Sequence, residues 1–237
     1  MMLLTKILLA HILGDFFLQP QKWVREKERR KLKSPELYFH TIIHLALLFL
    51  ILWDITLWPL IVIIGVLHLI IDAIKLLFQK ESTKRLWFFM DQLLHICTIL
   101  LVYMFFTGID VNLSALLQNS TLLLITSVLF LTSPVSVIMK VIFTKWNIDE
   151  LIKSGESLED AGKYIGILER LLVFVFIVTN HWEAVGFLIT AKSVFRFGDL
   201  KESKSRKLTE YILIGTLISF GIAIAVGLLF NYAVIKS

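Results

Sequence analysis

The sequence contains a single cysteine, Cys97, among its 237 residues. One thiol excludes an internal disulfide and a metal site built from several thiolates, so a metal site here would have to use imidazole and carboxylate ligands. Charged residues are also scarce, at 18%, whereas hydrophobic residues make up 57% of the chain and phenylalanine alone occurs 18 times. This composition excludes an ordinary soluble domain.

Several familiar catalytic patterns are missing as well. The chain has no Walker loop, no GxSxG elbow, no HExxH helix and no Rossmann glycine pattern, so the common soluble-enzyme chemistries have no support. It also has no evident internal repeat, which disfavours a transporter built from repeats. The net charge of +5 does not indicate nucleic-acid binding, because the basic residues lie between the apolar segments.

What the chain does contain is a series of apolar segments close to the length of about 20 residues that spans a bilayer. They indicate an all-α, polytopic helical membrane protein: one bundle and one domain, 1–237, with about eight spans and a range of six to eight. The first segment lacks the features of a cleavable signal, so we expect it to be retained. The segment 184–200 either crosses or is re-entrant or interfacial. The predicted spans are residues 2–19, 36–53, 58–79, 87–107, 119–143, 162–180, 184–200 and 209–233.

The distribution of lysine and arginine predicts the orientation. The connections 20–35, 75–85, 140–163 and 192–207 carry seven, four, four and six basic residues, whereas 54–57, 108–118 and 180–183 carry none. Basic loops stay on the cytoplasmic side. We therefore expect a multi-pass protein of the bacterial cytoplasmic membrane with both termini outside. The linker 20–35 is expected to be a surface helix, either as simple topogenic charge or to gather an anionic lipid or substrate.

Polar side chains occur in pairs four residues apart in each of the first four predicted spans. Residues four apart lie on one face of a helix, so each pair projects from its own helix as a unit. Ionisable groups within a membrane are costly and normally face a partner, water or an ion. The four pairs are His11/Asp15, His40/His44, His68/Asp72 and Asp91/His95.

These pairs are expected to lie at one depth. Depth is counted from the cytoplasmic helix ends at about 1.5 Å per residue. The member of each pair nearer the cytoplasm then lies roughly 6 to 11 Å deep, and the other member roughly 12 to 17 Å. The nearer members are Asp15, His40, Asp72 and Asp91. Unrelated polar groups would have no reason to agree in depth. We therefore predict one shared site that opens to the cytoplasm.

The ligand types at this site suit a divalent transition metal, with zinc or manganese favoured and one or two ions. Two members, His11 and Asp91, are predicted catalytic residues that accept or donate protons. The same layer could instead relay protons or fix helix packing. The predicted metal ligands are Asp15, His40, His44, His68, Asp72 and His95.

The second half of the chain carries a different polar cluster. One interpretation is that Arg170, Lys192 and Arg196 hold the phosphate or carboxylate of a substrate, because arginine has a suitable fork geometry. The other is structural, with Glu169 pairing with Lys192 or Arg196. The sequence does not choose between them.

The segments HILGDFFLQP, HTIIH, HLIIDAIK and DQLLH, followed by GILERLL, AKSVFRF and EYILIGTLIS, resemble a bacterial membrane family catalogued as domain of unknown function 3307. The resemblance covers nearly the full length and implies almost nothing about activity. The spacing of His and Asp also resembles, more loosely, that of bacterial membrane-bound metal-dependent hydrolases.

Together these observations predict a metal-dependent hydrolase that acts from the cytoplasmic side on a lipid-linked or otherwise membrane-delivered substrate. Its expected partners are membrane lipids and an anionic substrate, without nucleic acid. A proton- or cation-coupled transporter that uses the same layer is one alternative. A non-catalytic membrane scaffold or sensor is another. The oligomeric state is not predicted.

Overall fold

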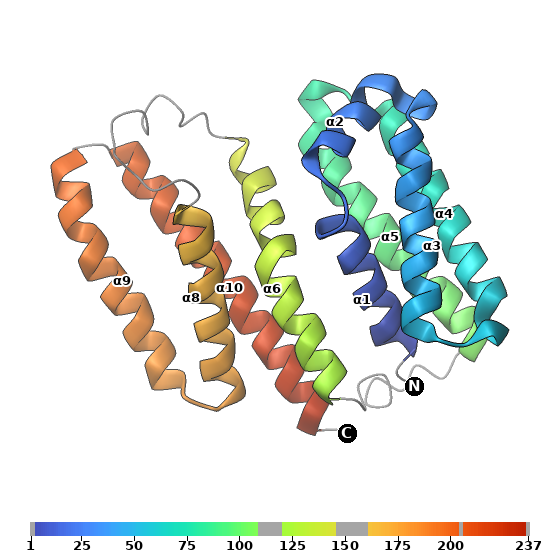
Figure 1. Cartoon of the computed structure of the whole chain (residues 1–237). Coiled ribbons are helices and arrows are strands. Elements are labelled where there is room, and N and C mark those ends of the chain that lie inside the picture. Colours follow the sequence, from blue (N-terminus) through green and yellow to red (C-terminus); the bar gives the residue numbers. More distant parts are fainter. Residues whose placement is uncertain (1–2, 109–119, 146–160, 204–205, 236–237) are drawn as a thin grey trace. The chain divides into compact units, whose positions relative to one another are not determined.

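Every regular element in the described part of the chain is a helix, which confirms the all-α prediction (Figure 1). The computed structural model describes residues 3–108, 120–145, 161–203 and 206–235. These residues form two compact units, one ending at Thr126 and the other spanning Ser127–Ile235, where the sequence had indicated no boundary.

The N-terminal unit is a bundle of four long helices closed at one end by a short one. Helices α1 (Leu3–Phe16), α3 (Pro35–Leu52), α4 (Trp58–Phe78) and α5 (Lys84–Thr107) run side by side, while α2 (Gln21–Arg30) lies across their ends (Figure 1). The axes of α1 and of the α2 segment meet at 79°. Short 3-10 turns η1 (Lys31–Lys33), η2 (Ile55–Leu57) and η3 (Glu81–Thr83) join the helices.

The half of this bundle away from α2 is filled by apolar side chains. Aliphatic residues from all four long helices interdigitate there, together with the ring of Tyr103. Such a core stabilises by close packing of apolar groups. Its buried members are Leu4, Ile7, Ala10, Leu48, Leu52, Leu60, Ile61, Ile64, Ile99, Val102 and Tyr103.

The C-terminal unit contains most of α6 (Ser120–Phe143), with α8 (Ala161–Val178), α9 (Trp182–Ser203) and α10 (Arg206–Ile235). Helix α8 packs along α10 and also contacts α9. Arg170 of α8 is 3% exposed and joins three helices. Its Nε donates to the Leu131 carbonyl of α6 at 2.7 Å, close to Pro134 inside that helix, and its Nη1 donates to Ser219 of α10 at 3.3 Å.

Each of the eight predicted spans coincides with a helix, but not all are shown to be membrane spans. Within the described residues, five helical segments are long and apolar enough to cross a membrane, or six if α1 and the bent α2 segment count as one broken span. Large apolar side chains on their outer faces, such as Leu50 and Phe105, are exposed, as lipid-facing residues would be. Eight crossings, including one by 184–200, remain a prediction.

Candidate metal centre

The four His and Asp pairs meet in one buried layer near the α2 end of the N-terminal bundle. Each pair comes from a different helix, since α1, α3, α4 and α5 each contribute two side chains. Three overlapping groups in this layer bring one ligand atom from each member within 4.8 Å of the others. The predicted convergence is therefore observed. The groups are His11, Asp15, His44 and His68; His40, His68 and Asp72; and Asp72, Asp91 and His95.

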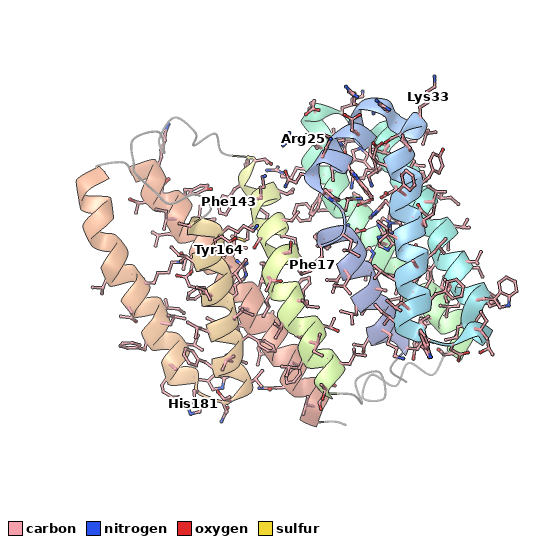
Figure 2. The ribbon with its side chains drawn as sticks, viewed as in Figure 1. Phe17, Arg25, Lys33, Phe143, Tyr164 and His181 are labelled. Atoms are coloured by element: carbon pink, nitrogen blue, oxygen red, sulfur yellow. The ribbon has the colours of Figure 1, made fainter. Side chains whose placement is uncertain are left out.

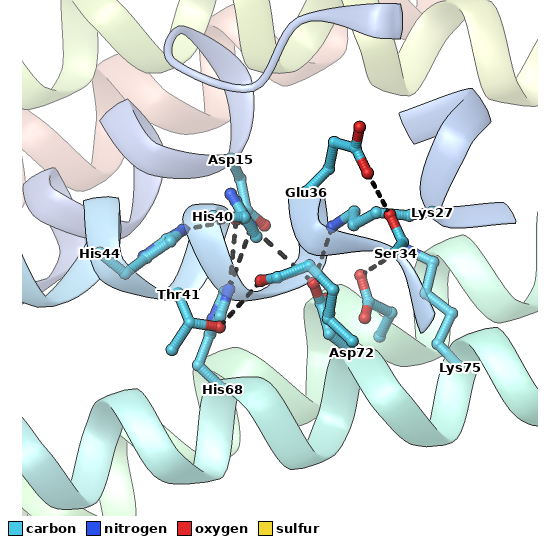
Figure 3. Close-up of polar contacts among 12 residues, drawn as sticks. Asp15, Lys27, Ser34, Glu36, His40, Thr41, His44, His68, Asp72 and Lys75 are labelled. Carbon is cyan, nitrogen blue, oxygen red and sulfur yellow. Dashed lines mark hydrogen bonds and ion pairs between the residues drawn. The ribbon is translucent and has the colours of Figure 1, made fainter. Parts of the chain in front are cut away.

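Asp15 is the centre of this layer (Figure 3). Its Oδ1 lies 3.0 Å from Nε2 of His44, 3.2 Å from Nε2 of His40 and 3.8 Å from Nε2 of His68. The Nε2 atoms of His40 and His68 are themselves 3.2 Å apart. Ligand atoms that bind one tetrahedral ion at about 2.0 to 2.2 Å are separated by about 3.3 Å. The observed separations bracket that value, so Asp15 together with imidazoles of this set could hold an ion. His40 and His44 belong to different groups of the three, and both groups contain His68.

Several polar atoms of the layer have no hydrogen-bond partner among the described residues. They are buried, and they include both ring nitrogens of His11, Nδ1 of His40 and Nε2 of His95. A buried polar group without a partner costs about 1 to 3 kcal/mol. A layer serving only helix packing would be expected to satisfy these atoms, whereas a ligand or water at the site would supply partners for them.

Two of the three carboxylates are neutralised by lysines. Lys27 of α2 contacts Oδ2 of Asp72 at 2.8 Å, and Lys75 of α4 contacts Oδ2 of Asp91 at the same distance. Asp15 has no lysine partner among the described contacts. Instead its Oδ2 accepts a hydrogen bond from the Gln92 side chain at 2.8 Å. Asp15 is thus the carboxylate left for a metal ion.

The charges of the layer leave room for a cation. Three carboxylates and two ammonium groups give a net charge of −1 when the imidazoles are neutral. One divalent ion would reverse the net charge to one positive.

Lys27 was missed by reasoning from the sequence, which placed the linker 20–35 on the membrane surface. In the structure Lys27 is 6% exposed and α2 is tied to the ends of α4 and α5. Lys31 donates to the carbonyl of Leu76, and Glu28 accepts from Gln79 and Lys84. A signal was present in the spacing, because Trp23, Lys27 and Lys31 recur every four residues and so share one face of the segment.

A small cavity lies on the core side of the layer. Imidazoles of His11, His44, His68 and His95 line it together with Thr98 and aliphatic side chains. Its volume of about 10 Å³ is comparable with the space that one water molecule needs. The unpartnered atoms of His11 and His95 therefore belong to residues that border a water-sized space.

Gly14 permits the close approach of α1 to the His44 ring. A Cβ at position 14 would lie 2.4 Å from Cε1 and Nε2 of His44, so the ring would have to move. We expect Gly14→Ala to weaken binding of a transition metal about tenfold or more, because His44 is displaced from Asp15. Competition against a chromophoric chelator in detergent measures the affinity.

The matched control for this glycine is Gly221→Ala in α10, where an added Cβ meets no heavy atom within 4 Å. It should leave the metal affinity unchanged. An unaltered affinity in Gly14→Ala as well would contradict the placement of His44 at the metal.

The predicted substrate-binding cluster of the second half is engaged differently. Arg170 donates to backbone carbonyls and hydroxyl groups of α6 and α10. Lys192 pairs with Glu169, as the structural interpretation of this cluster predicted. The side chain of Arg196 lies outside the described residues. The two described cations therefore have protein partners, and a role in substrate binding stays a prediction.

Comparison with known protein families gives a match to the N-terminal half of the chain. Residues 3–124 match the family described as Protein of unknown function (DUF3307). The matched region contains the whole His and Asp layer. It ends before GILERLL, AKSVFRF and EYILIGTLIS, the later segments that also resembled this family in the sequence analysis. No curated protein and no solved structure matches the chain. Because the match covers more than half of its residues, the chain belongs to this family of unknown function.

Proposed function

We propose that the protein is a multi-pass protein of the bacterial cytoplasmic membrane that uses a divalent transition metal, zinc or manganese, to hydrolyse a lipid-linked or membrane-delivered substrate. One observation carries the proposal: imidazole nitrogens of three helix-borne histidines converge on a single carboxylate oxygen of Asp15, whose side chain is 10% exposed. Imidazole with carboxylate is a donor set that suits these metals.

The ligands of one ion would be Asp15, His40, His44 and His68. When bound, the metal supplies a lowered pKa for a coordinated water and polarises the scissile bond. A second ion would need Asp72, Asp91 and His95. Because Lys27 and Lys75 already neutralise the two carboxylates, the layer favours one ion over two.

His11 is the better placed of the two predicted catalytic residues. It borders the water-sized cavity, and neither of its ring nitrogens has a hydrogen-bond partner among the described residues. It can therefore accept a proton from a water held there. Asp91 instead contacts Lys75, and its backbone carbonyl lies 2.8 Å from Nδ1 of His95, so it orients its neighbours.

The fold favours hydrolysis over transport. A transporter needs a polar route through the bundle, yet beyond the layer the described residues of the N-terminal unit form the apolar core. The layer thus resembles a site with a closed inner end. A scaffold role is disfavoured by the unpartnered imidazole nitrogens, which helix packing alone does not explain.

Hydrolysis can be tested before the natural substrate is known. Metal-loaded protein in detergent is assayed against chromogenic carboxyl esters, phosphomonoesters and phosphodiesters. We expect metal-dependent turnover of at least one class. In His11→Gln, kcat should fall by about 10² to 10⁴ while the bound metal is retained, because the proton acceptor is lost.

The control variant is His181→Gln, which changes an exposed histidine in the turn before α9. Its turnover should equal that of the unaltered protein. Turnover that survives removal of the metal, or a His11→Gln variant with full activity, would contradict the proposed mechanism.

A further inference from the structure

We infer that Lys27 and Lys75 bind an anionic phosphoryl group of the substrate on the α2 side of the metal layer, so that the substrate class is a phosphate ester. This inference rests on the proposed metal-dependent hydrolysis and adds the substrate's chemistry to it. It assigns substrate binding to a lysine pair in the N-terminal unit.

The two lysines approach the proposed metal ligands along separate chains of contacts, and Figure 3 shows the first of them, from Lys27 through Asp72 and His40 to Asp15. On one side Lys27 contacts Asp72, whose Oδ2 lies 3.9 Å from Nε2 of His40. On the other side Lys75 contacts Asp91, whose Oδ2 accepts from Gln92 at 3.3 Å. His40 and Gln92 both contact Asp15. Both lysines are therefore connected to the central carboxylate through two intervening side chains.

Each ammonium group has donors to spare. A lysine carries three N–H donors. Among the described residues, Lys27 and Lys75 each have one hydrogen-bond acceptor, which is an aspartate oxygen. The Lys27 side chain is 7% exposed and that of Lys75 is 23% exposed, so water competes weakly for the remaining donors. Phosphate oxygens are strong acceptors for such charge-assisted hydrogen bonds.

The charge of the layer selects an anion only when metal is present. Without metal the three carboxylates and two ammonium groups leave a net negative charge, which repels phosphate. With a divalent ion the same layer is net positive and complements the negative charge of a phosphate ester. A neutral carboxyl ester gains nothing from this charge, so the electrostatics discriminate between the two substrate classes.

The surface outside the layer has the matching sign. Helix α2 and the turn η1, which cover the layer, carry exposed basic side chains. Arg25 and Lys33 project from this part of the chain in Figure 2. Such a surface raises the local concentration of anions. The exposed cations at this end are Lys22, Arg25, Arg29, Arg30, Lys33, Lys80 and Arg85, of which Arg29 and Arg30 pair with Glu26.

The test measures binding of two phosphate probes to the full chain in detergent, by the shift of thermal unfolding with probe concentration. The probes are inorganic phosphate and short-chain phosphatidic acid, with short-chain diacylglycerol as the uncharged counterpart. Metal-loaded protein should bind at least one phosphate probe about tenfold or more tightly than metal-free protein does. Binding of phosphate alone indicates a soluble ester, and binding of phosphatidic acid alone indicates a lipid-borne one.

The variant that tests the lysine is Lys27→Met/Asp72→Asn, which removes both members of the ion pair and so leaves no buried charge unpaired. We expect it to keep its metal and to bind the phosphate probe about tenfold more weakly. Lys75→Met/Asp91→Asn should behave in the same way. Lys140→Met, which removes an exposed cation from α6 outside this basic surface, should bind as the unaltered protein does.

The outcomes separate this inference from the proposed function. If both double variants hold metal and bind phosphate as tightly as the unaltered protein, the inference is wrong and the metal site stands. The inference is also wrong if phosphate binds equally with and without metal. An unaltered protein that takes up no transition metal contradicts the proposed function itself, and the inference with it.

Discussion

Replacing Asp15 with asparagine should lower the affinity for a transition metal about a hundredfold or more. The amide keeps the size of the side chain and can still contact Gln92, but it removes the negative charge on which the histidine nitrogens converge. It also removes the one carboxylate of the layer that no lysine neutralises. Chelator competition on detergent-purified protein measures the loss.

The matched control for this change is Asp54→Asn in the turn between α3 and α4. Hydrogen bonds from the Thr56 hydroxyl and backbone N–H hold the pKa of Asp54 below its usual range, and the residue is exposed, far along α3 from the layer. Its substitution should leave metal binding unchanged. If Asp15→Asn also binds metal normally, then Asp15 is not a ligand and the assignment of the centre fails.

The second large effect concerns the C-terminal unit, where Arg170→Met should destabilise the fold by about 2 to 3 kcal/mol. The guanidinium makes four hydrogen bonds to α6 and α10, and interhelical hydrogen bonds in membranes contribute about 0.6 kcal/mol each. Unfolding in mixed micelles with increasing denaturing detergent gives the free energy of unfolding.

Lys192→Met provides the comparison within the same unit. Lys192 pairs with Glu169, both side chains are partly exposed, and its ammonium group lies 5.3 Å from the centre of the Phe220 ring. Removing this pair should cost less than about 1 kcal/mol. Equal losses in the two variants would show that Arg170 does not hold the three helices together.

The spacing of the polar residues predicted that the His and Asp side chains converge, because helices translate sequence spacing directly into geometry. Residues four apart share a helix face, so each pair had to project together. The common depth of the pairs then brought His11, His44, His68 and His95 close to one another, with ring centres 3.9 to 5.8 Å apart where they touch. Length and hydropathy likewise located every long helix.

The pairing of Lys27 with Asp72 could not be predicted in the same way. The two residues are 45 positions apart, and the contact depends on how sharply the chain turns after α1. A basic segment next to a membrane span ordinarily indicates topology, so its charge pattern concealed the buried member. Only the three-dimensional fold shows that α2 covers the layer.

Arg170 shows a second limit of the sequence. A charged residue in an apolar helix predicts a partner but does not identify it. The sequence suggested a phosphate or carboxylate of a substrate, whereas the guanidinium contacts carbonyls of α6 near Pro134 and hydroxyl groups of Ser136 and Ser219. Which faces of α6, α8 and α10 meet is decided by packing, which no local pattern specifies.

The central claim is that imidazoles from α3 and α4 and the carboxylate of α1 bind one transition-metal ion. It is tested most directly by elemental analysis of the detergent-purified protein, stripped of loosely held ions, combined with X-ray absorption at the edge of the metal found. The account predicts about one equivalent of zinc or manganese per chain, bound by about three imidazoles, and its loss in His40→Ala/His68→Ala. Protein without metal, or metal without imidazole ligands, would contradict it.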